Sequence, residues 1–175
     1  MVMCIRHKAP SNISRPIRRN KPGHMNLIVP LLPPAHILLD MEVSSKKRLF
    51  EQVAELFETS IGVAHDTVFD SLRAREKLGS TALGHGIAIP HGRIKGLRQA
   101  SGALLRLGAP IAFDAPDNAP VALIFILLVP VQATDQHLQI LGELAQMFSD
   151  KRLREALIGA PDAAAVHALI TGWSA

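Results

Sequence analysis

Val121 to Val129 is the longest uninterrupted run of apolar side chains in the sequence, nine residues long. A membrane-spanning helix needs about 20 such residues, so this run is too short to cross a bilayer. Side chains of a β-strand alternate between two faces, and a strand is apolar throughout only when both faces are buried. The run therefore predicts an interior strand, and other elements are required to cover both sides of its sheet.

Two helical patterns precede this strand. The first has apolar residues at three- and four-residue spacing, a serine cap at Ser44 or Ser45, and an end at Gly62. The second is predicted to extend from a cap at Asp66 to about Lys77. The residues expected to face the core are Leu49, Phe50, Val53, Ala54, Phe57 and Ile61 in the first helix and Val68, Phe69 and Leu72 in the second.

Three more helical patterns follow, one starting at Thr134 or Asp135 and two covering residues 151–158 and 162–170. In the first of these, the expected inward residues are Leu138, Leu141, Leu144, Ala145 and Phe148. Shorter strands are expected at residues 36–39, 87–89 and 103–107. Helices and strands alternate without an internal repeat, which predicts an α/β fold, a single-domain sandwich with a central sheet flanked by helices.

The net charge of +4 is unevenly distributed along the chain. Residues 1–24 contain six Lys and Arg residues, three prolines and no acid, so we expect them to form a disordered basic extension. Residues 25–175, the predicted folded domain, have 13 Lys and Arg residues against 15 Asp and Glu residues. This net charge of −2 does not indicate a nucleic-acid-binding domain.

The chain also lacks the marks of a secreted or membrane protein. The apolar residues that follow the basic extension are interrupted by Pro30, Pro33 and Pro34, which excludes a signal-peptide core. Cysteine occurs once, at Cys4, so a disulfide framework or a Cys-rich zinc site is excluded. We therefore expect a cytoplasmic protein without membrane insertion.

His91 is the first of three histidines whose contexts favour chemistry. It follows the apolar residues 87–89 and Pro90, so a short strand would deliver its imidazole to a rigid bend. Gly92 would leave the far side of the ring open. The alternative interpretation is an ordinary polar turn residue, since turns collect polar side chains.

His137 and His85 have less specific surroundings. His137 lies in the first turns of a predicted helix, at the edge of its buried face, where a half-buried structural histidine is a common alternative. His85 lies between two glycines, which permits either a ligand role or plain solvation. A catalytic zinc site formed by His85, His91 and His137 is a further hypothesis. No H-x-x-x-H pair supports it.

Arg73, Arg75 and Lys77 end the second predicted helix just before a glycine-rich stretch, residues 78–93. Cations are favoured at a helix C-terminus by the helix dipole alone. Guanidinium groups also match phosphate oxygens, and a glycine-rich loop can present backbone amides beside them. The stretch contains no nucleotide-binding glycine motif, so a phosphoryl group attached to another protein is the anion that fits it better.

Residues 75–81, Arg-Glu-Lys-Leu-Gly-Ser-Thr, and residues 84–93, Gly-His-Gly-Ile-Ala-Ile-Pro-His-Gly-Arg, together form a specific pattern. It closely resembles the IIA domains of the bacterial sugar phosphotransferase system, specifically the nitrogen-regulatory IIA proteins of the fructose and mannitol type. The likeness continues through residues 110–115, 121–130 and 137–138. It covers residues 25–175 and leaves residues 1–24 outside.

The resemblance implies a mixed β-sheet flanked by helices and a phosphocarrier activity that uses no cofactor and no metal. The phosphorylated histidine of the family maps onto His91, its second active-site histidine onto His137 and its active-site arginine onto Arg75. Ser80 is expected to contribute to phosphoryl binding, and His85 is a supporting residue without a fixed role. The implied donor is the phosphohistidine of an HPr-like carrier protein.

Elementary chemistry adds expectations to these assignments. His91 must present an unprotonated nitrogen, so we expect a backbone carbonyl to bind its other ring nitrogen and fix the tautomer. His137 would donate to the attached phosphoryl group, and Arg75 would contact its oxygens. Docking is expected through an apolar rim around residues 87–89 and Leu83, because a carrier must release its partner.

Two functions stay open under the resemblance. In one, the phosphorylation state of His91 sets the affinity for regulated proteins, such as a potassium transporter or a sensor kinase, in nitrogen- or potassium-linked regulation. In the other, the protein is a sugar-specific IIA component that passes the phosphoryl group to a IIB domain. No sugar-transport domain is fused to this sequence, which favours regulation.

Overall fold

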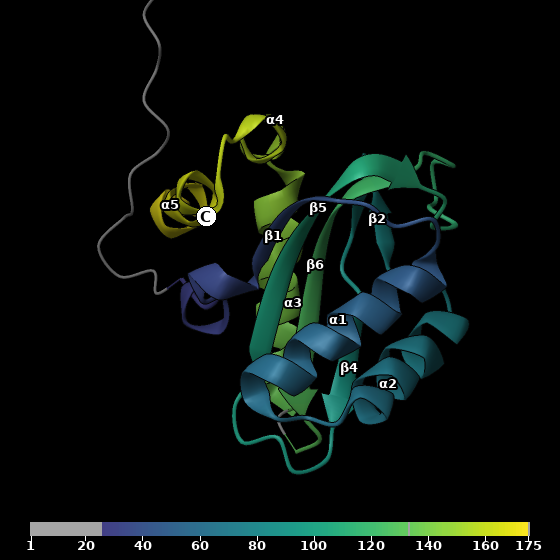
Figure 1. The fold of residues 1–175 in the computed structure, drawn as a ribbon. Coiled ribbons are helices and arrows are strands. Elements are labelled where there is room, and N and C mark those ends of the chain that lie inside the picture. The colour runs from purple at the N-terminus through teal and green to yellow at the C-terminus, as the bar shows by residue number, and fades with distance from the viewer. Residues whose placement is uncertain (1–25, 133, 175) are drawn as a thin grey trace, which may run out of the picture.

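β6 (Val121–Pro130) lies in the middle of a six-stranded sheet, as its apolar sequence predicts (Figure 1). The computed structural model describes residues 26–132 and 134–174. Side chains of β6 alternate between two buried clusters, with Leu123, Phe125 and Leu127 in one and Ile124, Ile126 and Leu128 in the other. The prediction of a strand buried on both faces is thereby confirmed.

The sheet combines parallel and antiparallel pairs in the order β1-β5-β6-β3-β2, and β4 also pairs with β6. β1 (Ile37–Met41) runs parallel to β5 (Ser101–Ile111), which is antiparallel to β6. β3 (Ile87–Ala88) and β4 (His91–Ile94) both run parallel to β6. β2 (Ala82–Gly84) is antiparallel to β3.

β3 and β4 pair with β6 in one continuous register, interrupted at Pro90. Proline has no N–H to donate to a ladder. The carbonyl of Pro90 still accepts the N–H of Leu127 in β6 at 2.9 Å, and Ile89 donates its N–H to the carbonyl of Thr81, on the other side of the strand, at 3.0 Å. The pairing with β6 therefore loses one donor at Pro90 but continues to His91.

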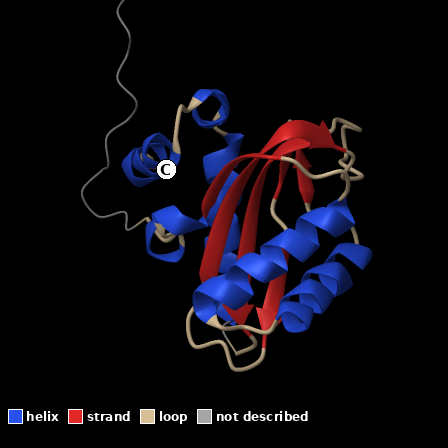
Figure 2. Cartoon of the chain, in the orientation of Figure 1, coloured by secondary structure: helices blue, strands red, loops and turns tan. Residues whose placement is uncertain are grey.

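Helices cover both faces of the sheet (Figure 2). α1 (Lys46–Ile61) and α2 (His65–Lys77) pack on one face. The other face is covered by α3 (Thr134–Ser149), α4 (Lys151–Gly159) and α5 (Ala163–Gly172). Two short 3-10 helices, η1 (Val29–Leu31) and η2 (Pro34–His36), precede β1. The result is a single α/β domain, a mixed sheet between helical layers, in agreement with the predicted fold class.

The predicted ends of α1 are confirmed, whereas the predicted start of α2 is wrong. Ser45 caps α1 with its side-chain oxygen, and Gly62 ends it in the left-handed region, at φ 71°. Asp66 does not cap α2; it lies in the first turn, after His65 has begun the helix. The carboxylate of Glu58 accepts the N–H of His65 at 3.0 Å, so this helix start is satisfied by α1.

Three residues expected in the core are exposed: Ile61, Leu138 and Ala145. Leu138 is 68% exposed, whereas its neighbour His137 is only 6% exposed. The buried face of α3 is therefore rotated by about one residue from the predicted face. The first residue of the observed buried face is His137, which is polar. A search for the spacing of apolar residues does not detect it.

The predicted basic extension, residues 1–24, lies outside the described residues. Asn26, the first described residue, is hydrogen-bonded to α5, because its Nδ2 donates to the carbonyl of Ile170 at 2.8 Å. None of the helices within residues 26–132 and 134–174 is long and apolar enough to cross a membrane.

Candidate functional site

His91 begins β4 and has a half-buried side chain. The sequence predicted a bend here with an open far side at Gly92, and the structure corrects both points. Gly92 packs against α2, where a Cβ would overlap the Oγ of Ser71 and lie 3.1 Å from its Cβ. The glycine permits β4 to approach α2 closely, which brings His91 beside the end of that helix.

Two hydrogen bonds fix the tautomer of His91. Its Nδ1 lies 2.9 Å from the carbonyl oxygen of Ile89, which can only accept, so Nδ1 carries the proton. Arg75 donates its Nε–H to the Nε2 of His91 at 3.0 Å, so Nε2 holds a lone pair. Both bonds require the same neutral imidazole. The backbone carbonyl expected from the sequence is that of Ile89.

Burial lowers the pKa of His91 below the ordinary value of 6.5, because the charged ring loses hydration. The hydrogen bond to the carbonyl of Ile89 acts in the opposite direction, and the cations of Arg75 and Arg93 lower the pKa further. Since burial is the largest cause, the neutral ring is favoured. Nε2 therefore keeps its lone pair at neutral pH.

The ring of His137 lies beside that of His91, with centroids 5.2 Å apart and planes at 73°. Its two ring nitrogens are buried and have no hydrogen-bond partner within the described part of the chain. Burial lowers the pKa of His137, and positive charge on His91, Arg93 and Arg75 lowers it further. A neutral imidazole in this state has a donor available for a group attached to His91.

Arg75 extends from the last turn of α2 and also donates Nη1–H to the carbonyl of Gly79 at 3.0 Å. The other two cations predicted for an anion site, Arg73 and Lys77, have exposed side chains. Of these three described cations, Arg75 is the one hydrogen-bonded to His91.

Ser80 and His85 stabilise loops, and no hydrogen bond given for the described residues joins either of them to His91. The Oγ of Ser80 donates to the carbonyl of Phe113 at 2.6 Å. His85 occupies the turn between β2 and β3 at φ 55°, with its backbone N–H donated to Asp117 at 2.8 Å and its side chain exposed. A part for Ser80 in phosphoryl binding stays a prediction.

Arg93 is a cation of the site that the sequence analysis missed. It follows His91 by two residues in β4, so the two side chains lie on one face of the strand. Its side chain is exposed, and its charge lowers the pKa of both His91 and His137. Strand alternation would have identified Arg93, but this segment was predicted to be a bend.

The predicted docking rim is wrong for residues 87–89, because Ile87 and Ile89 belong to the core. Leu83, in β2, is exposed as expected. Two further leucines expose their side chains next to elements of the site: Leu78, which follows α2, and Leu138, which follows His137. We refer to Leu78, Leu83 and Leu138 as the exposed leucines.

The zinc hypothesis loses its geometric basis. Across residues 26–132 and 134–174, no group of three or more His, Cys, Asp or Glu side chains is placed so that it could hold a metal ion. The structure pairs His91 with His137 and leaves His85 at its hairpin turn.

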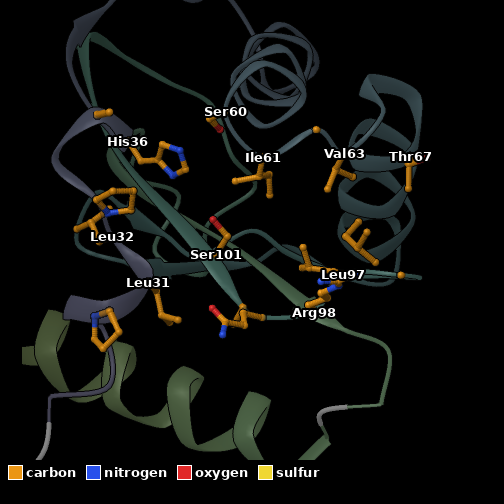
Figure 3. A pocket seen from close by; sticks show the side chains of 18 of the residues that line it. Leu31, Leu32, His36, Ser60, Ile61, Val63, Thr67, Leu97, Arg98 and Ser101 are labelled. Carbon is orange, nitrogen blue, oxygen red and sulfur yellow. The ribbon is translucent and has the colours of Figure 1, made fainter.

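A hollow of about 1140 Å³ opens elsewhere on the molecule (Figure 3). It lies between the segment 29–36, the connection from α1 to α2, and the loop 94–101, and its lining includes His36, Ile61 and Arg98. The candidate site residues His91, Arg75 and His137 do not line this hollow. Since β4 begins at His91 and ends at Ile94, the hollow lies beyond the far end of that strand.

Residues 30–172 match the family described as "Phosphoenolpyruvate-dependent sugar phosphotransferase system, EIIA 2", and the chain belongs to this family. The chain is also similar to proteins named nitrogen regulatory protein. One from Pseudomonas aeruginosa is 44% identical over 141 residues, which are 80% of this chain and 92% of that protein.

Two solved structures share the fold. The crystal structure of nitrogen regulatory protein IIA-Ntr from Neisseria meningitidis has a TM-score of 0.79 and 55% identity, over 82% of this chain and 99% of that chain. The IIA mannitol structure from Escherichia coli has a TM-score of 0.68 and 20% identity, over 79% of this chain and 97% of that chain. The predicted resemblance is confirmed, and these similarities support a phosphocarrier or regulatory role in a phosphotransferase system.

Proposed function

We propose that this protein accepts a phosphoryl group on Nε2 of His91 from the phosphohistidine of an HPr-like carrier, and that its phosphorylation state regulates cytoplasmic target proteins. The observation that carries the proposal is the pair of hydrogen bonds that keeps a lone pair on Nε2 of His91. The ring of His137 lies beside this nitrogen's ring, with 5.2 Å between the two centroids. Family membership and the similarity to nitrogen regulatory proteins support it.

The transfer exchanges one phosphorus–nitrogen bond for another. The bond to the donor's ring nitrogen breaks, leaving its electron pair on the donor, as Nε2 of His91 forms the new bond. No proton has to move when the second ring nitrogen of the donor carries a proton, because each imidazole then keeps its own N–H. The Nδ1–H of His91 stays hydrogen-bonded to the carbonyl of Ile89. Transition states of this kind are loose and anionic, so alignment and charge stabilisation are the tasks of the protein.

Arg75 has to release the lone pair of Nε2 before the new bond can form. Its Nη1–H bond to Gly79 can hold the guanidinium group close while Nε–H becomes free. Guanidinium donors match phosphoryl oxygens in geometry and charge. Arg75 would therefore protect the nucleophile before transfer and bind the phosphoryl group after it.

His137 supplies the second donor. A buried polar group without a partner carries a desolvation cost of about 1–3 kcal/mol. A phosphoryl oxygen on His91 would accept the N–H of His137 and remove the cost of this buried donor, one of the two unpartnered ring nitrogens. The unpartnered ring of the free protein is thus explained by the phosphorylated state.

Phosphorylation would also change the docking surface. The histidine pair carries no negative charge in the free protein, and the transferred group would add about −1.5 to −2 charges at His91. A partner that covers the leucines with an apolar surface would bind the phosphorylated form more weakly. A potassium transporter and a sensor kinase are the candidate targets.

The test is to incubate the full chain with phosphoenolpyruvate and the general phosphotransferase proteins, including an HPr-like carrier. We expect an acid-labile adduct of about 80 Da in the mass spectrum. The adduct should be absent from His91→Ala and present in His65→Ala, a matched loss of a histidine at the start of α2. Uptake by His91→Ala would overturn the site assignment.

Transfer of the phosphoryl group to a IIB domain is the alternative function. The family description, a sugar phosphotransferase system, supports this alternative. The phosphorylated protein should be mixed with purified fructose-type and mannitol-type IIB domains. Rapid loss of the label to either domain would favour the sugar-specific function. Stable label together with phosphorylation-dependent binding of a target would favour regulation.

A further inference from the structure

Glu76 is a buried carboxylate next to Arg75 in the sequence, and the proposed transfer does not use it. It lies in the last turn of α2 with a side chain only 7% exposed. Its Oε1 accepts from the Nζ of Lys46 at 2.8 Å. Its Oε2 accepts from the Oγ1 of Thr81 at 2.6 Å and from the backbone N–H of Thr81 at 3.2 Å. These donors hold the carboxylate in one orientation.

Thr81 transmits this constraint to His91. The carbonyl of Thr81 accepts the N–H of Ile89 at 3.0 Å. The carbonyl of Ile89 in turn accepts Nδ1–H of His91 at 2.9 Å. A continuous series of hydrogen bonds therefore joins the carboxylate of Glu76 to the proton that defines the tautomer of His91.

Glu76 also constrains Arg75. The Nη1–H of Arg75 donates to the carbonyl of Gly79, and the carboxylate of Glu76 accepts from Thr81. Two adjacent residues of α2 are therefore hydrogen-bonded to the same short loop. Both contacts hold this loop against the end of α2. They restrain the direction in which the Arg75 side chain leaves the helix toward His91.

Lys46 anchors the arrangement to the start of α1. Besides Glu76, its Nζ donates to the Oδ2 of Asp114 at 3.0 Å and to the carbonyl of Phe113 at 3.3 Å. The same nitrogen lies 4.5 Å from the centroid of the Phe113 ring. Glu76 is thus held from α1 on one side and holds the loop of Thr81 on the other.

We propose that Glu76 is a positioning residue for the phosphoryl transfer, because it fixes both hydrogen bonds that select the Nδ1–H tautomer of His91. Its consequence for the transfer rate rests on the proposed function. The tautomer itself is a property of the unphosphorylated protein, so it can be measured whether or not that function is correct.

The primary test is Glu76→Gln in the full chain, with isotope-labelled histidine and NMR detection of the His91 ring nitrogens above their pKa. The amide replaces one carboxylate oxygen by an N–H group, which then faces a donor on Lys46 or Thr81. We expect the ratio of Nδ1–H to Nε2–H tautomers to fall about tenfold, the effect of losing about one hydrogen bond. Phosphoryl uptake should fall by a similar factor.

Glu51→Gln is the matched control, because it makes the same chemical change in an ion pair of α1, with Arg48 at 2.8 Å. It should leave the tautomer ratio and the uptake rate unchanged. A tautomer shift in Glu51→Gln as large as that in Glu76→Gln would overturn the proposal.

Thr81→Val and Thr81→Ser keep the test decisive if Glu76→Gln does not fold. Valine removes the hydroxyl donor, so Thr81→Val should lower the ratio of Nδ1–H to Nε2–H tautomers as Glu76→Gln does. Serine keeps the hydroxyl, so Thr81→Ser should have the wild-type ratio. An unchanged ratio in both Glu76→Gln and Thr81→Val, with only a lower midpoint of urea unfolding, would show that Glu76 is merely structural. If the wild-type protein takes up no phosphoryl group, the proposed function fails, and the tautomer ratios still decide the role of Glu76.

Discussion

Arg75 and His91 meet through the nitrogen that the proposed transfer requires, with 3.0 Å between the Nε of Arg75 and the Nε2 of His91. In the free protein this bond selects the reactive tautomer and at the same time covers its lone pair. Transfer needs a cation that can exchange this bond for contacts to phosphoryl oxygens without leaving the site. Guanidinium, with several donors in one plane, satisfies that need.

Arg75→Lys should therefore lower the rate of phosphoryl uptake by about 10²-fold, although the charge is retained. An ammonium group cannot hold the carbonyl of Gly79 and reach His91 with the same geometry. Initial rates of transfer from a radiolabelled HPr-like carrier measure the effect. Arg73→Lys, on the exposed side of the same helix, is the control and should react at the wild-type rate. A wild-type rate in Arg75→Lys would show that the planar fork is not needed.

The pH dependence of uptake should reflect the lowered pKa of His91. Burial favours the neutral ring, so Nε2 remains a nucleophile below pH 6.5, where an ordinary histidine is mostly protonated. In single-turnover experiments with a preformed phosphorylated carrier, the rate should fall to half at a pH below about 6.5. A midpoint at or above that value, after correction for titration of the carrier, would contradict this expectation.

The fold was predictable where burial leaves a pattern in the sequence. The apolar residues of β6 indicate a strand covered on both faces, and the spacing in α1 indicates a helix with one buried face. β2 and β4 left no such pattern, because they have three and four residues and contain glycines. Their hydrogen bonds depend on pairing with β3 and β6, which only the tertiary structure provides.

The candidate site was predicted from a motif and not from periodicity. His91, Arg75 and His137 were assigned from the resemblance, and the sheet brings them together across more than 60 positions of sequence. Glu76 went unnoticed, although it stands inside the same motif, because its partners Lys46 and Thr81 are defined only by the fold. A contact between distant segments has no local signature.

Arg106 should contribute more to stability than its ion-pair partner Asp40. Its side chain is 11% exposed, against 73% for Asp40. Its Nη1 also donates to three carbonyls at the end of α4, those of Leu157, Ile158 and Ala160. Arg106→Met leaves these acceptors unsatisfied and should cost about 2–4 kcal/mol in the free energy of unfolding.

Asp40→Asn is the matched control for Arg106→Met, and it should cost less than about 1 kcal/mol because the carboxylate is largely in water. Asparagine also tolerates the left-handed backbone of this position, φ 56°. Urea unfolding of both variants measures the difference. Equal losses would mean that the ion pair, and not the capping of α4, is the stabilising interaction.

Gly92→Ala should destabilise the protein by about 1–3 kcal/mol and disturb His91. The new Cβ would overlap the Oγ of Ser71 and press β4 away from α2. In the Ser71→Ala background the hydroxyl is absent, so the same substitution should cost less. A double-mutant cycle by urea unfolding gives the coupling, and additive effects would contradict direct packing between these two residues.

His137→Leu should separate stability from function. The substitution removes two buried ring nitrogens that have no partner within the described residues, so the free energy of unfolding at neutral pH should rise by on the order of 1 kcal/mol. Phosphoryl uptake should fall by about 10²-fold, because the donor to the phosphoryl group is lost. A variant that is less stable than wild type at neutral pH would contradict the view that this imidazole is retained for transfer.

The pH dependence of unfolding gives a second readout of the same variant. Burial lowers the folded-state pKa of His137 below 6.5, so the unfolded state binds more protons between that lowered value and 6.5. The contribution is complete above about pH 6.5 and is lost as the pH falls through the folded-state pKa. His65 acts with the opposite sign, because Asp66 raises its pKa, and both proteins should therefore carry His65→Ala. In that background His137→Leu should lose stability less steeply on acidification than the protein with His137, and equal slopes would show that His137 titrates normally in the folded state.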